Sequence, residues 1–295
     1  MADILKGADV VSAINNKMAA KIEELAGKGI IPAMATIRIG ERADDISYEK
    51  TAVKRCEAVG VTVKNIILPA DADQCTLMKN IYSLNDDNNI HGILLFRPLP
   101  KHISDDVCRA AIRPEKDIDG ITDSSLAGVF TGSGHGFAPC TAQACIEVLD
   151  YYNIDCKGKR VVIIGRSLVV GKPVAMMLMA KHATVTICHT RTVDIPSVAR
   201  NAEILIVAAG QMEGLTKEYF SPGQTVIDVG INWNENKGKL CGDVLFEDAE
   251  PVVAAITPVP GGIGTVTTSV LISHVVDAAM NLSNQQEYIK NDFNR

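Results

Sequence analysis

The sequence is poor in aromatic residues and has no paired-cysteine motif. Phe, Trp and Tyr together make up 4% of the 295 residues, and there is a single Trp. The eight cysteines are scattered along the chain without a Cys-x-x-Cys pair. This pattern favours reduced thiols in a cytoplasmic protein, and it predicts neither a disulfide framework nor a metal site.

The sequence also lacks the apolar segments that a secretion signal or a membrane span would need. Charged residues are spread through the first 25 residues, which contain no continuous apolar core. No stretch approaches the roughly 20 uninterrupted apolar residues of a transmembrane helix. The formal net charge of −6 argues against a nucleic-acid-binding surface. We therefore expect neither a membrane nor a nucleic-acid partner, although a local arginine cluster could still bind a small anion.

What the sequence does contain is a regular alternation of strand-like and helix-like segments. In the N-terminal part, the pattern predicts strands over residues 32–39, 61–68 and 92–96 and helices over residues 12–25, 47–59 and 75–84. Ser12 is a candidate N-cap of the first helix. Because parallel strands need a crossover of helical length, this alternation predicts a parallel α/β sheet.

A second α/β series follows a region rich in Gly, Ser and Thr. That region, residues 122–139, is predicted to be a connecting or active-site loop. After it come a helix over residues 141–152 and strands over residues 159–164, 183–188, 204–208 and 225–229. This spacing is typical of a nucleotide-binding sheet. A long helix over residues 267–284 ends the series, and the polar tail from residue 285 is expected to be loosely ordered.

A glycine-containing turn follows the first strand of this second series. It reads Gly-Arg-Ser-Leu-Val-Val-Gly-Lys-Pro over residues 165–173. Glycine lets the backbone turn tightly and approach phosphates, and the N-terminus of the next helix directs its free N–H groups towards an anion. The turn is therefore a candidate dinucleotide pyrophosphate site. The spacing differs from Gly-x-Gly-x-x-Gly, so a plain strand-to-helix turn is the alternative.

The end of the next strand favours a phosphorylated ribose. An NAD site normally has a carboxylate at this position, but residues 189–192 read His-Thr-Arg-Thr. Arg191 and Arg166 could bind a 2′-phosphate, with the Thr190 hydroxyl as a further donor. This favours NADP as the cofactor, with NAD also possible. Asp194 is expected to be a loop or helix-cap residue.

Several segments together resemble the methylenetetrahydrofolate dehydrogenase/cyclohydrolase family (FolD type). They are residues 114–120, 139–141, 165–173, 183–192, 226–232 and 257–264, in the order of the family and within a match that runs from about residue 37 to 273. The resemblance implies an α/β subunit of two domains, usually a homodimer, with the substrate cleft between them. A folate domain (residues 1–140) would be completed by the C-terminal helix (267–295), and a Rossmann-type NAD(P)-binding domain (141–266) would lie between.

The resemblance also implies an activity. The family transfers a hydride from the one-carbon unit of 5,10-methylenetetrahydrofolate to the nicotinamide, which gives 5,10-methenyltetrahydrofolate. Most members then hydrolyse that product to 10-formyltetrahydrofolate. The N5 lone pair of the folate stabilises the cation that is left behind, so positioning of the two reactants should carry most of the catalysis.

Individual site residues follow from the same resemblance. Tyr48 corresponds to the tyrosine that packs against the folate rings and can hold a proton-transfer network, and Asp119 corresponds to the pterin-binding aspartate. These two are the predicted catalytic residues, and both also bind substrate. The other predicted substrate contacts are Pro98, Leu99, Pro258, Pro260, Gly261 and Gly262. The predicted cofactor contacts are Gly165, Arg166, Ser167, Gly171, Thr190, Arg191, Ile231 and Thr267.

One departure from the family bears on the second activity. The family motif is Tyr, three residues, Lys, with a glycine eight residues after the lysine. Counting back from Gly60 leaves Tyr48 in place but puts Ala52 at the lysine position. The glutamine of the family's Val-Gln-Leu-Pro-Leu-Pro run is also replaced, because residues 95–100 read Leu-Phe-Arg-Pro-Leu-Pro. Alanine can neither donate a proton nor stabilise a developing negative charge. We therefore expect a monofunctional dehydrogenase with weak or absent cyclohydrolase activity.

Three alternatives remain at this point. The chain could be bifunctional if Lys50 or Lys54 replaced the missing lysine, although each is offset by about 200° around an ideal helix. It could be a folate-binding protein without turnover. It could also be a dehydrogenase of the shikimate or amino-acid type, a plan that does not require the Asp-Ile-Asp-Gly and Pro-Val-Pro-Gly-Gly motifs found here.

Overall fold

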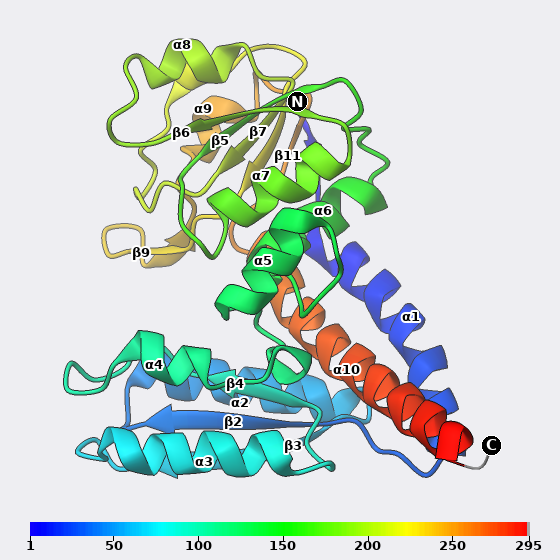
Figure 1. Ribbon diagram of the computed structural model, residues 1–295. Helices are drawn as coiled ribbons and strands as arrows, with labels where there is room; N and C mark the ends of the chain where they lie inside the picture. The colour runs from blue at the N-terminus through cyan, green and yellow to red at the C-terminus, as the bar shows by residue number, and fades with distance from the viewer. Residues whose placement is uncertain (294–295) are drawn as a thin grey trace. The chain divides into compact units, whose positions relative to one another are not determined.

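The chain folds into two α/β units, which confirms the predicted fold class (Figure 1). In this computed structural model, the backbone is described for residues 1–293 and the side chains for residues 1–284. The first unit comprises Met1–Ala13, Val129–Gly132 and Pro139–Val270, and the second comprises Ile14–Gly128, Ser133–Ala138 and the chain from Leu271 onwards. Each unit has its own parallel sheet and its own core.

The first unit is built on a six-stranded parallel sheet with strand order β1-β11-β8-β7-β5-β6. Its strands are β1 (Asp3–Ile4), β5 (Arg160–Ile164), β6 (Thr184–Cys188), β7 (Ile204–Val207), β8 (Thr225–Asp228) and β11 (Ala255–Ile256). The four longer strands are those that the sequence predicts. The pattern misses β1 and β11 because each is two residues long, too short to show a periodicity.

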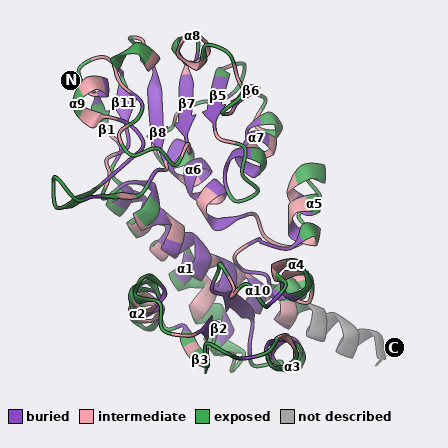
Figure 2. Ribbon diagram, turned by 90° about the vertical axis from the view of Figure 1, so that its left-hand side faces the viewer, coloured by how far each residue is buried: buried purple, intermediate pink, exposed green. Residues whose placement is uncertain are grey.

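Helices cover both faces of this sheet, as a parallel sheet requires. They are α6 (Cys140–Tyr151), α7 (Gly171–Ala180), α8 (Ile195–Arg200) and α9 (Phe246–Ala249), with a short 3-10 helix η2 (Lys217–Tyr219) and a hairpin of β9 (Asn232–Asn234) and β10 (Lys239–Cys241). Helix α7 packs against β5, β6 and α6. Residues from α8 and α9 join alternate residues of β5, β7 and β8 in one buried cluster. Figure 2 shows β7 and β8 buried along their length.

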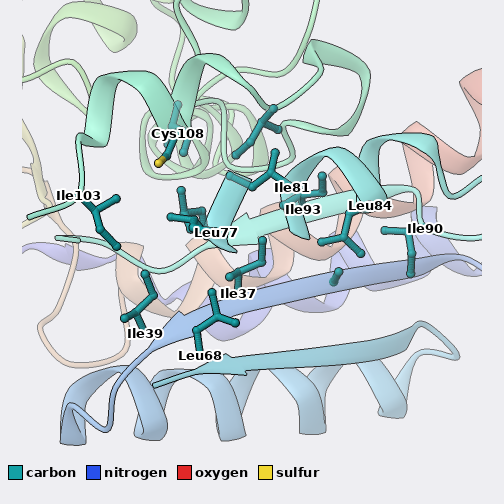
Figure 3. Close-up of a cluster of buried hydrophobic side chains, with 14 of the residues drawn as sticks. Ile37, Ile39, Leu68, Leu77, Ile81, Leu84, Ile90, Ile93, Ile103 and Cys108 are labelled. Atoms are coloured by element: carbon teal, nitrogen blue, oxygen red, sulfur yellow. The ribbon is translucent and has the colours of Figure 1, made fainter. Parts of the chain in front are cut away.

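The second unit has a three-stranded parallel sheet in the order β3-β2-β4. Strand β2 (Ala33–Ile39) is central and buried throughout, between β3 (Thr62–Leu68) and β4 (Gly92–Leu95). Its odd-numbered residues join α3 (Gln74–Asp86) and Cys108 of α4 (Asp105–Ala110) in a hydrophobic cluster (Figure 3). Its even-numbered residues therefore point to the opposite face, where α2 (Ala43–Ala58) lies.

Helices α1 (Gly7–Gly27), α2 and α10 (Ile263–Phe293) each begin four or five residues before the predicted start. Helix α1 begins five residues before Ser12, whose hydroxyl donates to the Ala8 carbonyl (3.1 Å) and does not cap the helix. A Cβ atom on Gly7 would lie 2.4 Å from the Gly262 carbonyl oxygen, so the start of α1 is packed tightly against a distant loop. Helix α10 starts directly after Gly262.

The predicted loop over residues 122–139 contains a helix, α5 (Asp123–Thr131). Gly128 lowers the helix propensity of this segment. A Cβ atom there would lie 1.9 Å from the His135 carbonyl oxygen. The glycine therefore allows the chain after the helix to fold back closely upon it. Glycine in this segment thus reflects packing rather than a break in the helix.

Helix α10 is longer than the helix predicted over residues 267–284. Its first 22 residues, Ile263–Asn284, have the length and composition of a membrane span, but 67% of their most apolar window is buried within the protein. Polar residues such as His274 and Asp277 interrupt the apolar sequence of this segment, and its burial is that of a core helix. The prediction for the tail from residue 285 lies outside the residues whose side chains are described.

Candidate functional site

Tyr48 lies on α2 of the second unit and is 39% exposed. Its ring meets that of Phe96, just after β4, edge to face with the ring centroids 6.0 Å apart. The contact steadies a tyrosine whose surface is still open to a ligand. Phe96 therefore presents an apolar ring beside Tyr48.

Ala52 lies one turn after Tyr48 and is fully buried. It belongs to the stripe Asp45, Glu49, Ala52 and Cys56, whose spacing of four, three and four residues turns one face of α2 inward. Lys50 and Lys54 are both exposed on the same helix. The two lysines considered as replacements thus lie outside the buried stripe that contains Ala52.

A buried polar cluster lies between α2 and β2, in the same stripe as Ala52. Glu49 accepts hydrogen bonds from Thr36 Oγ1 (2.8 Å) and Arg38 Nε (3.2 Å). Arg38 and Glu49 form an ion pair and are both almost fully buried. The Arg38 guanidinium also donates to the Gly40 carbonyl at the end of β2. Sequence reasoning missed this cluster because its members lie on two different elements and form no motif.

Asp119 follows the 3-10 helix η1 (Pro114–Lys116) and is partly buried. Neighbouring residues hold the segment in place. Asp117 accepts hydrogen bonds from the backbone N–H groups of Ile121 (3.0 Å) and Thr122 (2.8 Å). Gly120 adopts a positive φ of 68°, which lets the chain reverse directly after Asp119. The two aspartates of the Asp-Ile-Asp-Gly motif therefore have different roles. Asp117 stabilises the turn by hydrogen bonds, and Asp119 lies on that turn.

Pro98 and Leu99 follow Phe96 in a loop that side chains anchor at both ends. The Arg97–Pro98 peptide bond is cis, and Arg97 forms a bidentate ion pair with Asp105 (both contacts 2.6 Å). Arg42, directly before α2, donates to the Pro98 carbonyl (3.3 Å). Leu99 packs against the hydrophobic cluster of the second unit. The structure thus brings the predicted residues 98 and 99 into the same region as the start of α2.

In the first unit, the predicted phosphate loop connects β5 to α7. Gly165 has a φ of 128°, and a Cβ atom on it would lie 2.2 Å from the Ala208 carbonyl oxygen. A Cβ atom on Gly171, the first residue of α7, would lie 2.1 Å from the Gly165 carbonyl oxygen. Ser167 Oγ accepts from the Val170 N–H (3.1 Å), which closes the turn. Only glycine permits this close approach of backbone segments at both positions.

The two predicted phosphate-binding arginines follow neighbouring strands. Arg166 comes after β5 and Arg191 after β6, which pair in parallel with Ile164 opposite Cys188. Both arginines are exposed at the carboxyl edge of the sheet, as is Thr190. Asp194 caps α8 by accepting from the Ser197 N–H (3.2 Å), so it is a cap residue as expected.

The remaining predicted residues lie around the start of α10. The Val259–Pro260 peptide bond is cis, and the Gly7 N–H donates to the Gly261 carbonyl (2.8 Å). A Cβ atom on Gly262 would lie 2.4 Å from the Pro258 carbonyl oxygen, so this loop is as tight as the phosphate loop. Ile231, after β8, is exposed. A Cβ atom on Gly264 would lie 2.6 Å from Ile231 Cδ1, so Ile231 packs against the start of α10. Thr267 Oγ1 donates to the Ile263 carbonyl (3.1 Å).

Sequence reasoning missed two buried aspartates in the first unit, Asp228 and Asp243. Asp228 ends β8, and Asp243 lies in the segment after β10. Both are almost completely buried, and burial raises the pKa of Asp228 to about 7. A carboxylate at the end of an apolar strand is a signal that could have identified Asp228. Asp243 could be recognised only as a partner of Asp228 in the folded chain.

These features define an NAD(P)-binding enzyme of the Rossmann type. Residues 139–283 match the NAD(P)-binding domain of tetrahydrofolate dehydrogenase/cyclohydrolase, and residues 5–119 match its catalytic domain. The chain therefore belongs to the tetrahydrofolate dehydrogenase/cyclohydrolase family and is an NAD(P)-dependent methylenetetrahydrofolate dehydrogenase. This membership excludes the dehydrogenases of the shikimate or amino-acid type.

The similarity to individual proteins of the family extends over almost the whole chain. The bifunctional protein FolD of Carboxydothermus hydrogenoformans is 47% identical over 94% of this chain and 97% of its own length. The crystal structure of the bifunctional FolD enzyme of Campylobacter jejuni superposes with a TM-score of 0.92, at 37% identity over 95% of this chain and 99% of that one. The Trypanosoma brucei enzyme, solved with NADP and an inhibitor, superposes with a TM-score of 0.88 at 34% identity, over 95% of this chain and 98% of that one.

Proposed function

We propose that this dehydrogenase oxidises 5,10-methylenetetrahydrofolate with NADP as the hydride acceptor. The observation that carries the choice of NADP is the pair of exposed arginines at the ends of β5 and β6, with no carboxylate at the end of β6. The loop after β5 is compatible with a dinucleotide, because Gly165 and Gly171 let the backbone turn tightly into α7, whose N-terminus favours an anion. When bound, NADP supplies the electrophilic ring that accepts the hydride.

In this proposal the chain's own residues bind and orient the substrate. Tyr48 offers an open aromatic face, steadied by Phe96, for the flat rings of the folate. Asp119 offers a carboxylate to the amino-pyrimidine edge, on a turn that Asp117 holds. The glycine- and proline-containing loop at residues 258–262 is proposed to contact substrate as well. Their work is to position the reactants, because the folate nitrogen itself stabilises the product cation.

The cofactor preference can be tested by comparing NADP with NAD in wild type and in Arg191→Ser. If Arg191 binds the 2′-phosphate, the variant should lose about tenfold or more in kcat/KM with NADP and little with NAD, as expected for removal of a charged hydrogen bond. Arg200→Ser is a matched control, because Arg200 is an exposed arginine on α8 whose guanidinium donates to the Glu218 carbonyl. Equal losses with the two dinucleotides would overturn the proposed role of Arg191.

The second activity of the family is proposed to be weak here. Ala52 is buried where the family has its lysine, and both nearby lysines on α2 are exposed. Cys56, one turn further along the same buried face, cannot replace the lysine because burial raises the pKa of its thiol to about 12. The names of the relatives favour the other possibility, a bifunctional enzyme that also forms 10-formyltetrahydrofolate. That alternative requires a group other than residue 52 to assist hydrolysis.

One time course separates the two possibilities. The protein is incubated with methylenetetrahydrofolate and NADP, and methenyltetrahydrofolate is followed by its absorbance. Methenyl product that persists, with decay no faster than without enzyme, supports a dehydrogenase alone. Enzyme-dependent decay supports the bifunctional alternative, and the variants Lys50→Ala and Lys54→Ala would then show which lysine contributes. Failure to form methenyl product with either dinucleotide would contradict the proposed oxidation.

The proposal includes a cytoplasmic homodimer. The cytoplasmic location is supported by the eight cysteines, all of which are free thiols. The dimer is supported by the family resemblance, and light scattering on the eluting protein would test it directly.

A further inference from the structure

Asp243 joins two loops at the carboxyl edge of the first unit's sheet. Its Oδ2 accepts from the N–H groups of Ala209 (2.7 Å) and Gly210 (2.8 Å), and its Oδ1 accepts from the N–H of Gln211 (3.0 Å) and from Asn232 Nδ2 (3.0 Å). The first three donors belong to the loop after β7, and Asn232 begins β9 after β8. A single buried carboxylate therefore holds the two loops together.

Asp228 in turn holds the segment that carries Asp243. Its carboxylate accepts from the backbone N–H groups of Gly230 (2.9 Å), Asp243 (3.2 Å) and Val244 (3.0 Å). The glycine at position 242 makes this possible, because a Cβ atom there would lie 1.8 Å from Asp228 Oδ2. The two aspartates thus form a chain of contacts from β8 through residue 243 to the loop after β7.

The position of these loops in the sheet indicates what they serve. In a doubly wound sheet, a dinucleotide lies across the carboxyl ends of the strands. Arg166 and Arg191, the proposed phosphate contacts, follow β5 and β6, and the sheet continues on the other side of β5 with β7 and then β8. The opposite end of the dinucleotide, which carries the nicotinamide, therefore belongs to the loops after β7 and β8. Ile231, a predicted cofactor contact, lies in the second of these loops.

We propose that Asp243, supported by Asp228, is a positioning residue for the nicotinamide half of the dinucleotide. It acts by fixing the backbone of residues 209–211 and 230–232, and it does not itself contact the cofactor. The inference rests on the proposed function for the identity of the dinucleotide. It predicts that loss of the carboxylate weakens binding of the nicotinamide half while the phosphate half still binds.

The test variant is Asp243→Asn, and the readout is binding rather than turnover. Each Asp243 oxygen accepts two N–H donors, so either orientation of an asparagine amide directs its NH2 group at two donors. We expect the dissociation constant for NADPH, measured by fluorescence titration, to rise about tenfold or more, as for loss of hydrogen bonds to a charged group. The dissociation constant for adenosine 2′,5′-bisphosphate, which lacks the nicotinamide, should stay within about twofold.

Gln224 provides a matched control in the same unit. It lies at the opposite, amino end of β8, is buried, and holds loops by donating to the carbonyls of Ala199 (2.7 Å) and Ala202 (3.0 Å). Gln224→Leu should lower the melting temperature as a structural lesion does, with both dissociation constants unchanged. Asn232→Ala, which removes one donor to Asp243, serves as a milder variant in case Asp243→Asn does not fold, and it should shift NADPH binding in the same direction.

The outcomes are distinct. If Asp243→Asn, or Asn232→Ala in its place, lowers stability and leaves NADPH binding unchanged, the aspartate is only structural and the inference is overturned. Equal weakening of NADPH and adenosine 2′,5′-bisphosphate would also overturn it, since the whole site would then be damaged. Should wild type bind NADPH but fail to oxidise methylenetetrahydrofolate, the proposed function fails while the binding comparison still decides the role of Asp243.

Discussion

Tyr48 is the residue whose exposed ring is most open to a direct test. Tyr48→Ala removes both the ring face and its contact with Phe96. An aromatic contact contributes about 0.5–1.5 kcal/mol beyond area burial, so we expect KM for methylenetetrahydrofolate to rise about 2- to 12-fold. Tyr48→Phe keeps the ring and should keep KM, so any loss of kcat in that variant isolates the role of the hydroxyl.

Tyr82 supplies the control for this comparison. It is an exposed tyrosine of the second unit, on α3 rather than α2. Tyr82→Ala should leave KM for the folate unchanged. If Tyr48→Ala behaves as Tyr82→Ala does, the proposed stacking role is wrong.

Arg38 and Glu49 allow a prediction about stability at the same scale. Arg38→Met leaves the Glu49 carboxylate buried without its ion-pair partner, which typically costs about 3–5 kcal/mol. The double variant Arg38→Met/Glu49→Leu removes both charges and should recover most of that loss. Urea unfolding of the three proteins measures the effect. A double variant no more stable than the single one would contradict this account.

At the scale of elements, the turn from β5 into α7 depends on Gly171. Gly171→Ala places a methyl group where only 2.1 Å separates it from the Gly165 carbonyl oxygen, so the phosphate loop must move. We expect the dissociation constant for NADPH to rise about tenfold or more, because the N–H groups at the start of α7 lose their alignment. The measurement is the same fluorescence titration as for Asp243→Asn.

Gly27, the last residue of α1, is the opposite case. Nothing lies within 4 Å of a Cβ atom there, and its φ is not in the left-handed region. Gly27→Ala should therefore leave NADPH binding unchanged and raise the free energy of unfolding by about 0.4–1 kcal/mol. Weaker NADPH binding in Gly27→Ala would show that the titration reports general damage rather than the phosphate loop.

The elements also show which parts of the fold the sequence could predict. The longer strands follow from short apolar runs, most of which are buried throughout, and α2, α3 and α6 follow from apolar residues at helical spacing. The start of α1 could not be predicted, since it depends on Gly7 fitting against Gly262 across almost the whole chain. Helix α5 could not be predicted for a similar reason: Gly128 is required by the close approach of the His135 carbonyl and does not mark the end of a helix.

The same division applies to the site. Gly165 and Gly171 lie in a short motif with a local physical reason, and Asp119 lies in a motif that resembles the family's, so all three could be proposed from the sequence. The Arg38–Glu49 pair and the contact between Asp228 and residue 243 join elements that only the folded sheet brings together. Buried residues that hold the loops of a site in place are harder to recognise from local sequence than residues at its surface.

For the molecule as a whole, Asp228 predicts an unusual pH dependence of stability. Burial raises its pKa in the folded state from 3.8 to about 7. A raised pKa means that the folded state holds the proton more tightly, so the stability contributed by Asp228 is greatest below pH 3.8 and is lost as the pH rises through 7. Relative to Asp228→Asn, wild type should lose up to about 4 kcal/mol of unfolding free energy between pH 4 and pH 8.

Urea unfolding of both proteins across that range measures the difference. Other carboxylates, such as Asp105 beside Arg97, have lowered pKa values and change stability in the opposite direction, but they are common to both proteins and cancel. A difference that stays constant with pH would mean that the backbone N–H groups around Asp228 keep it ionised throughout.

The interleaving of the two units along the chain has a consequence for how such a protein can change over generations. The boundaries between the units fall after residues 13, 128, 132, 138 and 270, and the first and last of these lie inside α1 and α10. Neither unit corresponds to one continuous stretch of coding sequence. A single recombination event therefore cannot exchange one unit for that of another gene. Exchange of a unit for that of another gene takes at least two crossovers within the reading frame.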